Sequence, residues 1–218
     1  MRLLLTGASG FVGRHAATQA VAAGYETVAI GRTDPGIAGL AFRACDLMDP
    51  AQLRSIVTDI RPQAVLHMAW YAEPGQFWNS SVNLDWVARS LDLARAFADV
   101  GGGRLVVAGS CAEYDWSGPM LDEATTPLNP STLYGHAKAG LFRLLEAGAP
   151  ELGISLGWGR IFFPYGPGDH PKRLLGCLMQ ALREGRPAQF SHGMQERDFR
   201  SEERRVGKEC RSRWSPYH

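Results

Sequence analysis

A glycine-rich turn near the start of the chain limits the possible folds more than any other feature. Gly7, Gly10 and Gly13 recur at a three-residue spacing between an apolar run, 3–6, and an amphipathic stretch, 11–23. Between a strand and a helix, such glycines permit a tight turn, close approach of the backbone to a pyrophosphate, and close packing of the helix on the strand. We therefore predict a dinucleotide site formed by these glycines and by their neighbours Ser9, Phe11 and Val12.

Short apolar runs alternate with longer amphipathic stretches over the first 162 residues. The pattern predicts further strands at 26–30, 40–44, 64–68, 104–108 and 154–161, and helices at 50–59, 83–98 and 131–147. Strands that alternate with helices of this length pair in parallel through right-handed crossovers. We therefore expect an α/β fold with a doubly wound parallel sheet (Rossmann-like) in residues 1–162. Gly/Pro-rich loops and one helix at 172–183 then indicate an incomplete C-terminal substrate lobe that starts over 163–199.

Composition and charge exclude several classes of partner. The net charge of +1 gives no reason to expect binding to nucleic acid or to an anionic membrane. No apolar run approaches the roughly 20 residues that span a bilayer. The four cysteines form no C-x-x-C pair that would indicate a metal site. We therefore expect a cytoplasmic protein with no membrane partner, no nucleic-acid partner and no metal.

The residues after the second and third predicted strands bear on the choice of dinucleotide. Folds that select NAD place an acidic residue after the second strand, on the adenosine ribose. This chain has Gly31 and Arg32 there, and a guanidinium suits the 2′-phosphate of NADP(H). NADP(H) is therefore favoured, with NAD(H) the alternative if Arg32 is merely solvated and Asp34 reaches the ribose. Residues expected to line the cofactor further along this edge are Asp46, Leu47 and Ala69.

Two later segments carry groups suited to chemistry on an alcohol or a ketone. Tyr134 and Lys138 are four residues apart, so a helix places both on one face. An ammonium close to a phenol lowers the pKa of the phenol and makes it a usable proton donor or acceptor. Ser110, at the end of the fifth predicted strand, can hydrogen-bond the same substrate oxygen. His67, which ends the fourth strand, is expected to be a packing residue instead.

The order of these motifs resembles the extended short-chain dehydrogenase/reductase family, the NAD(P)-dependent epimerases and dehydratases of nucleotide sugars. The resemblance rests on TGASGFVG, HMAW, GSCAEY, YGHAK and GRIFFPYGPGD, and it covers residues 1 to about 199. It implies a nucleotide-sugar substrate, a homodimer in full-length relatives, and catalysis by Ser110, Tyr134 and Lys138, with Lys138 also holding the nicotinamide ribose. It further implies a cofactor contact by Phe162 and substrate contacts by Asn83, Ser110, Tyr165 and Arg197.

The residues that follow Ser110 narrow the expected reaction. Dehydratases of the family carry an Asp–Glu pair here, the acid and base that eliminate water, whereas this chain has Cys111 and Ala112. Glu113 stands one place too late, and a strand would turn it to another face. We therefore expect a 4-ketoreductase or a 4-epimerase, with Cys111 in a structural role. The alternatives are a non-catalytic dinucleotide-binding sensor and an inactive truncated fragment.

The last residues, 200–218, depart from the pattern before them. They hold six Lys or Arg against three Asp or Glu, whereas residues 1–199 are net acidic, and they lack apolar periodicity. One interpretation is a basic tail that binds acidic partners. The other is a segment that is not native, because its residues can be back-translated into a string resembling a common sequencing adapter. We favour the second interpretation, and with it a substrate lobe that lacks its remainder.

Overall fold

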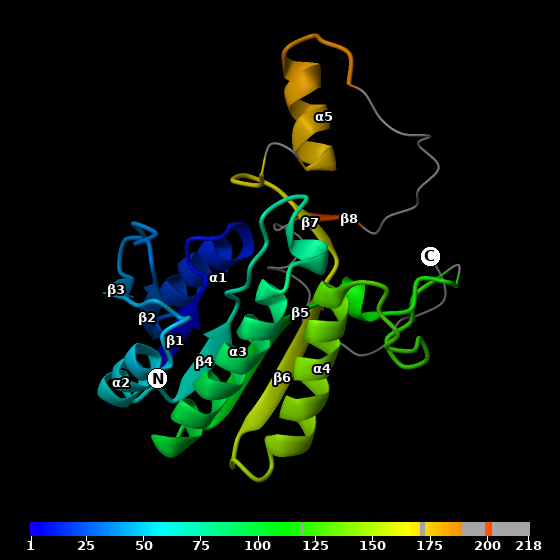
Figure 1. Ribbon diagram of the computed structural model, residues 1–218. Helices are drawn as coiled ribbons and strands as arrows, with labels where there is room; N and C mark the ends of the chain where they lie inside the picture. Colours follow the sequence, from blue (N-terminus) through cyan, green and yellow to red (C-terminus); the bar gives the residue numbers. More distant parts are fainter. Residues whose placement is uncertain (119, 171–172, 189–198, 202–218) are drawn as a thin grey trace. The chain divides into compact units, whose positions relative to one another are not determined.

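The computed structural model describes residues 1–118, 120–170, 173–188 and 199–201, and the chain divides into two units, Met1–Ile161 and Phe162–His218. The described residues of the first unit form a six-stranded sheet in the order β3-β2-β1-β4-β5-β6, with every neighbouring pair parallel (Figure 1). The strands are β1 (Arg2–Thr6), β2 (Glu26–Gly31), β3 (Ala41–Ala44), β4 (Ala64–His67), β5 (Arg104–Ser110) and β6 (Ser155–Ile161). This is the strand order of dinucleotide-binding α/β folds, so the predicted doubly wound sheet is confirmed.

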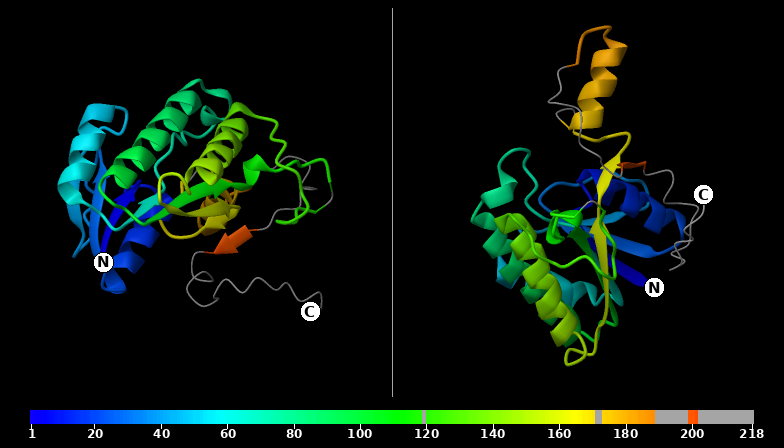
Figure 2. Two further views of the ribbon diagram at one scale, coloured as in Figure 1. Left: turned by 90° about the horizontal axis from the view of Figure 1, so that it is seen from below. Right: turned by 90° about the vertical axis from the view of Figure 1, so that its right-hand side faces the viewer.

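Helices cover both faces of this sheet. Helix α1 (Phe11–Ala22) lies on one face, and α2 (Pro50–Ile60), α3 (Val82–Asp99) and α4 (Leu133–Gly148) lie on the other (Figure 2). Local signals explain the bounds of α2. The side chain of Asp49 caps its first turn by accepting hydrogen bonds from Ala51 N and Gln52 N. The helix ends at Arg61, whose φ of 47° is left-handed.

The core has a large part under α2, α3 and α4 and a small part under α1. In the large part, Leu4, Val65 and Val107 of the sheet cluster with Leu93 and Phe97 of α3, and all five are almost completely buried. The small part consists of two clusters, one of Leu5, Ala8, Ala17 and Ala29 and one of Leu3, Ala20 and Ala64. Because most of these side chains are alanines, α1 lies close to the sheet, which fixes the turn between β1 and α1.

Several short elements are not predicted by the sequence pattern. Two are 3₁₀ helices of the first unit, η1 (Phe77–Asn79) and η2 (Cys111–Glu113). In the second unit, β7 (Phe163–Tyr165) pairs in parallel with β8 (Phe199–Ser201). The helix predicted over 172–183 is observed as α5 (Leu174–Arg183).

None of the described helices is long and apolar enough to cross a membrane. Nor does the described part of the chain bring together three His, Cys, Asp or Glu residues that could hold a metal ion. Residues 202–218, most of the segment predicted to be non-native, lie outside the described residues, as does Arg197.

Candidate active site at the carboxyl ends of the strands

The candidate site lies where β1, β4 and β5 end side by side. Thr6 of β1 pairs with His67 of β4, and His67 pairs with Val107 of β5, which continues to Ser110. Because the strands are parallel, their carboxyl ends and the loops that follow share one edge of the sheet. The glycine turn after β1, the segment after β4 and η2 after β5 therefore meet at this edge.

The glycine turn packs against the backbone that follows β4. Gly7 has a φ of 79°, and a Cβ built on it would lie 2.7 Å from Ala69 N. A Cβ on Gly13 would lie 1.9 Å from Gly7 O, so the first turn of α1 rests directly on the glycine turn. Thr6 strengthens the junction, because its buried Oγ1 accepts hydrogen bonds from Met68 N and Ala69 N at 3.2 and 3.1 Å. No side chain larger than hydrogen fits at positions 7 and 13.

Helix α1 begins without a capping side chain. Its N-cap is Gly10, and its first turn contains no acidic residue. Ser9 and Gly10 are exposed, and the atom nearest to a Cβ built on Gly10 is Gly7 O at 3.4 Å. Phe11 and Val12 follow and are half-buried. An uncapped helix N-terminus with exposed backbone beside it attracts anions, so these residues fit a dinucleotide diphosphate.

The predicted adenosine-binding residues lie on the loops after β2 and β3. Arg32 is exposed, whereas Asp34 uses its Oδ1 to accept a hydrogen bond from a backbone N–H two residues further on. Asp46 is exposed, and its Oδ1 accepts from Met48 N at 3.0 Å. The side chain of Leu47 belongs to the large core. The loop after β2 thus presents Arg32 to solvent and holds Asp34 partly within its own turn.

His67 is a buried, hydrogen-bonded part of the framework. Its Nδ1 lies 2.7 Å from Thr6 Oγ1, and its Nε2 lies 2.8 Å from Ser90 Oγ. Ser90 Oγ donates to Trp86 O, so we assign Nε2–H as the donor to Ser90 and Nδ1 as the acceptor from Thr6. Burial, with a smaller contribution from the charge of Lys138, lowers the pKa of His67 to about 3. The ring is therefore neutral at pH 7 and packs, as predicted.

Helix α4 packs directly on η2, the turn that follows Ser110. Thr132 caps α4, with its Oγ1 accepting from Gly135 N at 3.2 Å. A Cβ on Gly135 would lie 2.3 Å from Ala112 O, so the contact depends on glycine. Ser110 caps η2 in turn, because its Oγ accepts from Ala112 N. The contact brings the first turn of α4, which carries Tyr134, to the end of β5.

Lys138 is buried between β5 and an indole ring. Its Nζ donates to Ala108 O at 2.8 Å and lies 3.7 Å from the centre of the Trp70 ring, a cation–π contact. Burial lowers the pKa of the Lys138 ammonium to about 7, and the charge of Glu113 opposes that shift. Both protonation states of Lys138 are therefore populated at neutral pH.

Asn83 holds an aromatic wall beside Tyr134. Its Oδ1 accepts from Trp70 Nε1 at 2.9 Å, and its Nδ2 donates to two carbonyls of the segment that contains η1. The centroids of Phe77, Trp78 and Trp70 lie 4.9, 5.8 and 6.4 Å from that of Tyr134, all in edge-on contact. Asn83 is fully buried, so its amide serves this wall, and the contact with substrate stays a prediction.

A family model described as the NAD dependent epimerase/dehydratase family matches residues 3–201. The chain belongs to this family. The expected enzyme that binds a nicotinamide dinucleotide is therefore confirmed at the level of the family. Neither the reaction nor the roles of single residues follow from the match alone.

Relatives and solved structures of the family extend this result. The dTDP-6-deoxy-L-talose 4-dehydrogenase (NAD(+)) of Aggregatibacter actinomycetemcomitans is 26% identical, over 84% of this chain and 69% of the relative. The probable UDP-glucuronate 4-epimerase of Rhizobium meliloti is 25% identical, over 91% of this chain and 64% of the relative. The structure of MoeE5 in complex with UDP-glucose and NAD is 29% identical, with a TM-score of 0.77 over 92% of this chain and 68% of that chain. The chain thus spans about two thirds of the length of these proteins.

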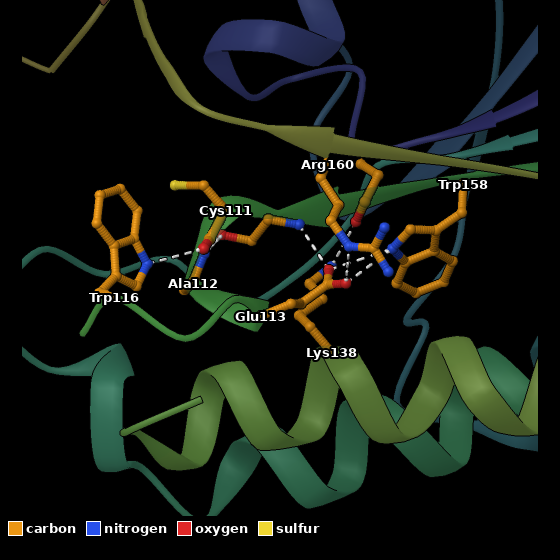
Figure 3. A network of polar contacts seen from close by, with 9 residues as sticks. Cys111, Ala112, Glu113, Trp116, Lys138, Trp158 and Arg160 are labelled. Carbon is orange, nitrogen blue, oxygen red and sulfur yellow. Dashed lines mark hydrogen bonds and ion pairs between the residues drawn. The ribbon is translucent and has the colours of Figure 1, made fainter. Parts of the chain in front are cut away.

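In this member of the epimerase/dehydratase family, a buried network lies behind Ser110. Glu113, expected to turn away at the end of a strand, is instead fully buried in η2. The strand argument fails because residues 111–113 form a 3₁₀ turn, to which a two-residue period does not apply. The Glu113 carboxylate accepts from Ser110 N at 2.7 Å and pairs with Arg160 (Figure 3). The spacing Ser110-x-x-Glu113 matches a capping box, a sequence signal that predicts this contact.

Three predicted site residues of this family member lie outside the first unit. Phe162 and Tyr165 belong to the second unit, and Arg197 lies outside the described residues. Their contacts with cofactor and substrate stay predictions. Trp70 is a site residue that sequence reasoning missed, because no spacing rule marks an indole that will pack on Lys138.

Proposed function

We propose that this chain belongs to an NAD(P)-dependent enzyme that interconverts an alcohol and a ketone at C4 of a nucleotide sugar, as a 4-epimerase or a 4-ketoreductase. The observation that carries the proposal is the contact of α4 with η2, which sets Tyr134 and Lys138 beside the end of β5, where Ser110 lies. The relatives support C4, since one is named a 4-dehydrogenase and another a 4-epimerase. MoeE5 supports a UDP-sugar, because its structure holds UDP-glucose and NAD.

Tyr134 is the acid and base in the proposed reaction. Its phenolate takes the proton of the C4 hydroxyl on oxidation, and its phenol returns a proton on reduction. Bound nicotinamide supplies the chemistry of hydride transfer. Lys138 places an ammonium one helical turn away, which favours the phenolate, and Ser110 donates a hydrogen bond to the same substrate oxygen. With a pKa of about 7, Lys138 gains or loses a proton at little cost near neutral pH.

The dinucleotide would be held along the edge from α1 to α4. The glycine turn and the start of α1 would bind the diphosphate, and Lys138 the nicotinamide ribose. For the adenosine end, we propose that Arg32 favours NADP(H), because its guanidinium is exposed and suits a 2′-phosphate, while one oxygen of the equally exposed Asp34 is engaged in its own turn. NAD(H) stays the alternative, since MoeE5, which is 29% identical, holds NAD.

Elimination of water is not part of the proposal. The two positions that carry acid and base in dehydratases hold Cys111 and Ala112, and alanine has no group that exchanges a proton. Glu113 does not replace them, because its carboxylate already accepts from Ser110 N, Trp158 Nε1 and Arg160 Nε.

Incubation of the protein with UDP- and dTDP-hexoses, each with NAD(H) or NADP(H), tests the proposal. We expect inversion at C4 or interconversion with a 4-keto sugar, followed by proton NMR of the sugar and by nicotinamide absorbance. Conversion only at another carbon, or conversion that is as fast in Tyr134→Phe as in the wild type, would contradict it.

We also propose that the protein forms a homodimer, as the family resemblance implies. Helices α3 and α4 each carry a large exposed leucine, Leu84 and Leu144, which is consistent with a partner on this side of the sheet. Light scattering of the purified protein should give twice the chain mass, and a mass equal to one chain at all concentrations would exclude the dimer.

A further inference from the structure

Glu113 is a fully buried carboxylate with three hydrogen-bond donors. Ser110 N lies 2.7 Å from its Oε1, Arg160 Nε lies 2.7 Å from its Oε2, and Trp158 Nε1 lies 3.2 and 3.1 Å from the two oxygens (Figure 3). The donors come from β5 and β6, so the carboxylate joins η2 to the edge of the sheet. One of the three is the backbone of a residue in the proposed catalytic site.

The surroundings of Glu113 are built to admit it. A Cβ on Gly109 would lie 2.2 Å from Trp158 Nε1 and 2.6 Å from Glu113 Oε1, so the glycine before Ser110 leaves the space that the carboxylate and the indole fill. The guanidinium of Arg160 also lies over the rings of Tyr114 and Phe142, at 5.1 and 4.7 Å. Two of the three donors to Glu113, Trp158 and Arg160, are therefore packed against neighbouring residues.

Stability alone is a weak reason for such a network. The desolvation of two buried charges offsets much of their attraction, and well-packed apolar side chains often serve as well or better. An apolar residue at position 113 would also leave Ser110 N without its partner. The network is therefore better explained by its effect on the neighbouring Ser110 and Lys138 than by its contribution to the stability of the fold.

We propose that Glu113 is a positioning residue of the Ser110–Tyr134–Lys138 site, an assignment that rests on the proposed function. Its carboxylate fixes the backbone from which Ser110 projects, and it places one negative charge behind the buried ammonium of Lys138. Arg160 holds that charge in position through an ion pair of 2.7 Å.

The charged groups around Lys138 determine the direction in which its pKa should change when one of them is neutralised. Among the described residues, Glu113 on η2 and His67 on β4 interact electrostatically with Lys138, Tyr134 lies one helical turn away on α4 itself, and Arg160 on β6 pairs with Glu113. His67 is neutral because burial lowers its pKa to about 3. The Glu113 charge raises the pKa of Lys138 against the larger effect of burial. Neutralising Glu113 should thus lower the pKa of Lys138.

NMR of the lysine side chains tests this directly and needs no substrate. The chain has three lysines, Lys138, Lys172 and Lys208, so protein labelled at lysine Cε gives few signals, and Lys138→Arg identifies one of them. In Glu113→Gln the titration midpoint of Lys138 should fall by about one pH unit or more. The matched control is Trp158→Phe, which removes a donor to Glu113 but no charge and should leave the midpoint in place.

Turnover of a nucleotide sugar completes the test. Glu113→Gln should lower kcat with little change in KM and should shift the pH profile in the direction of the Lys138 midpoint, whereas Trp158→Phe should do neither. If Glu113→Gln fails to fold, Glu113→Asp takes its place in the test. Glu113→Asp keeps the negative charge, so the Lys138 midpoint in this variant should stay close to that of the wild type. The assignment is overturned if Glu113→Gln raises the Lys138 midpoint or leaves it in place, or if kcat is unchanged in that variant. A different result would refute the proposed function instead. In that case the Lys138 midpoint falls as expected in Glu113→Gln, but Tyr134→Phe turns over the nucleotide sugar as fast as the wild type.

Discussion

The phenol of Tyr134 is the group on which the proposed proton transfer depends. Tyr134→Phe removes only its hydroxyl and leaves the ring in edge-on contact with Phe77. We expect turnover to fall by roughly 10²–10⁴-fold, the usual contribution of a positioned acid or base. Dinucleotide affinity, measured by calorimetry, should change little, because the ring and Lys138 stay in place. A loss of affinity as large as the loss of turnover would assign Tyr134 to binding instead.

Arg32 is the residue on which the choice of dinucleotide depends. Arg32→Ala should weaken NADPH binding by about 1.5–3 kcal/mol, the value of a hydrogen bond to a charged group, because the exposed guanidinium would no longer meet the 2′-phosphate. NADH has no such phosphate, so its affinity should stay the same. Calorimetry with both dinucleotides measures the difference. Equal affinities for NADH and NADPH in the wild type would show that Arg32 makes no selection.

His67 should make the folded state sensitive to acid. Its pKa is about 3 in the folded protein and about 6.5 when unfolded, so between these values the unfolded chain binds a proton that the folded chain does not. The free energy of unfolding therefore falls as the pH falls below 6.5, and His67 alone should account for about 2 kcal/mol of this loss by pH 5. Urea unfolding at pH 7 and pH 5 measures it. His67→Gln cannot titrate, and the same loss in that variant would exclude His67 as the cause.

At the scale of single residues, the sequence predicts the relative positions of the candidate site residues better than it predicts the side chains that pack around them. The Tyr134–Lys138 spacing on a helix is a local property, so it can be read from five residues of sequence. Trp70 and Arg160 meet Lys138 and Glu113 only because the fold brings distant segments together, and no spacing rule predicts that. Glu113 is the exception, since its capping-box spacing to Ser110 is local.

Helix α4 can approach η2 closely because residue 135 is glycine, and two glycines of the same helix provide a matched test. A Cβ on Gly135 would lie 2.3 Å from Ala112 O, whereas a Cβ on Gly140 would meet nothing within 4 Å. Gly135→Ala should therefore push α4 away from η2 and destabilise the fold by about 1–3 kcal/mol, with a loss of turnover. Gly140→Ala should stabilise it by about 0.5–1 kcal/mol. Chemical unfolding of both variants measures the difference, and equal effects would refute the contact.

Elements of ordinary length were predictable because periodicity accumulates over many residues. The strands and helices of the first unit lie close to the predicted ranges, and Asp49 even marks the first turn of α2. The elements η1, η2, β7 and β8 have three residues each, too few to show a period. Two of them, η1 and η2, line the candidate site. The sequence therefore predicts secondary structure least well in the segments next to the candidate catalytic residues.

The topology of the first unit is determined by the order of strands and helices along the chain rather than by any single element. Alternating strands and helices restrict the sheet to parallel pairing with right-handed crossovers, and the glycine turn identifies the first strand. The sequence therefore predicts the strand arrangement correctly, because it is a consequence of connectivity. The pairing of β7 with β8 is not predictable in this way, since it joins short segments far apart in the sequence.

Strand β6 lies at the edge of the sheet and is also the last strand of the first unit along the chain. It carries Trp158 and Arg160, and Arg160 follows Glu113 by 47 residues. A ribosome adds about 5–20 residues per second, so the glutamate is made several seconds before the arginine that neutralises it. Until β6 joins the edge, the turn after β5 holds a carboxylate without its cation, and burying it is unfavourable. The segment around Ser110 is therefore fixed only when β6, the final strand of the unit, is in place. The support of Ser110 by Glu113 and Arg160 is therefore completed at the end of the unit's synthesis, not along the way.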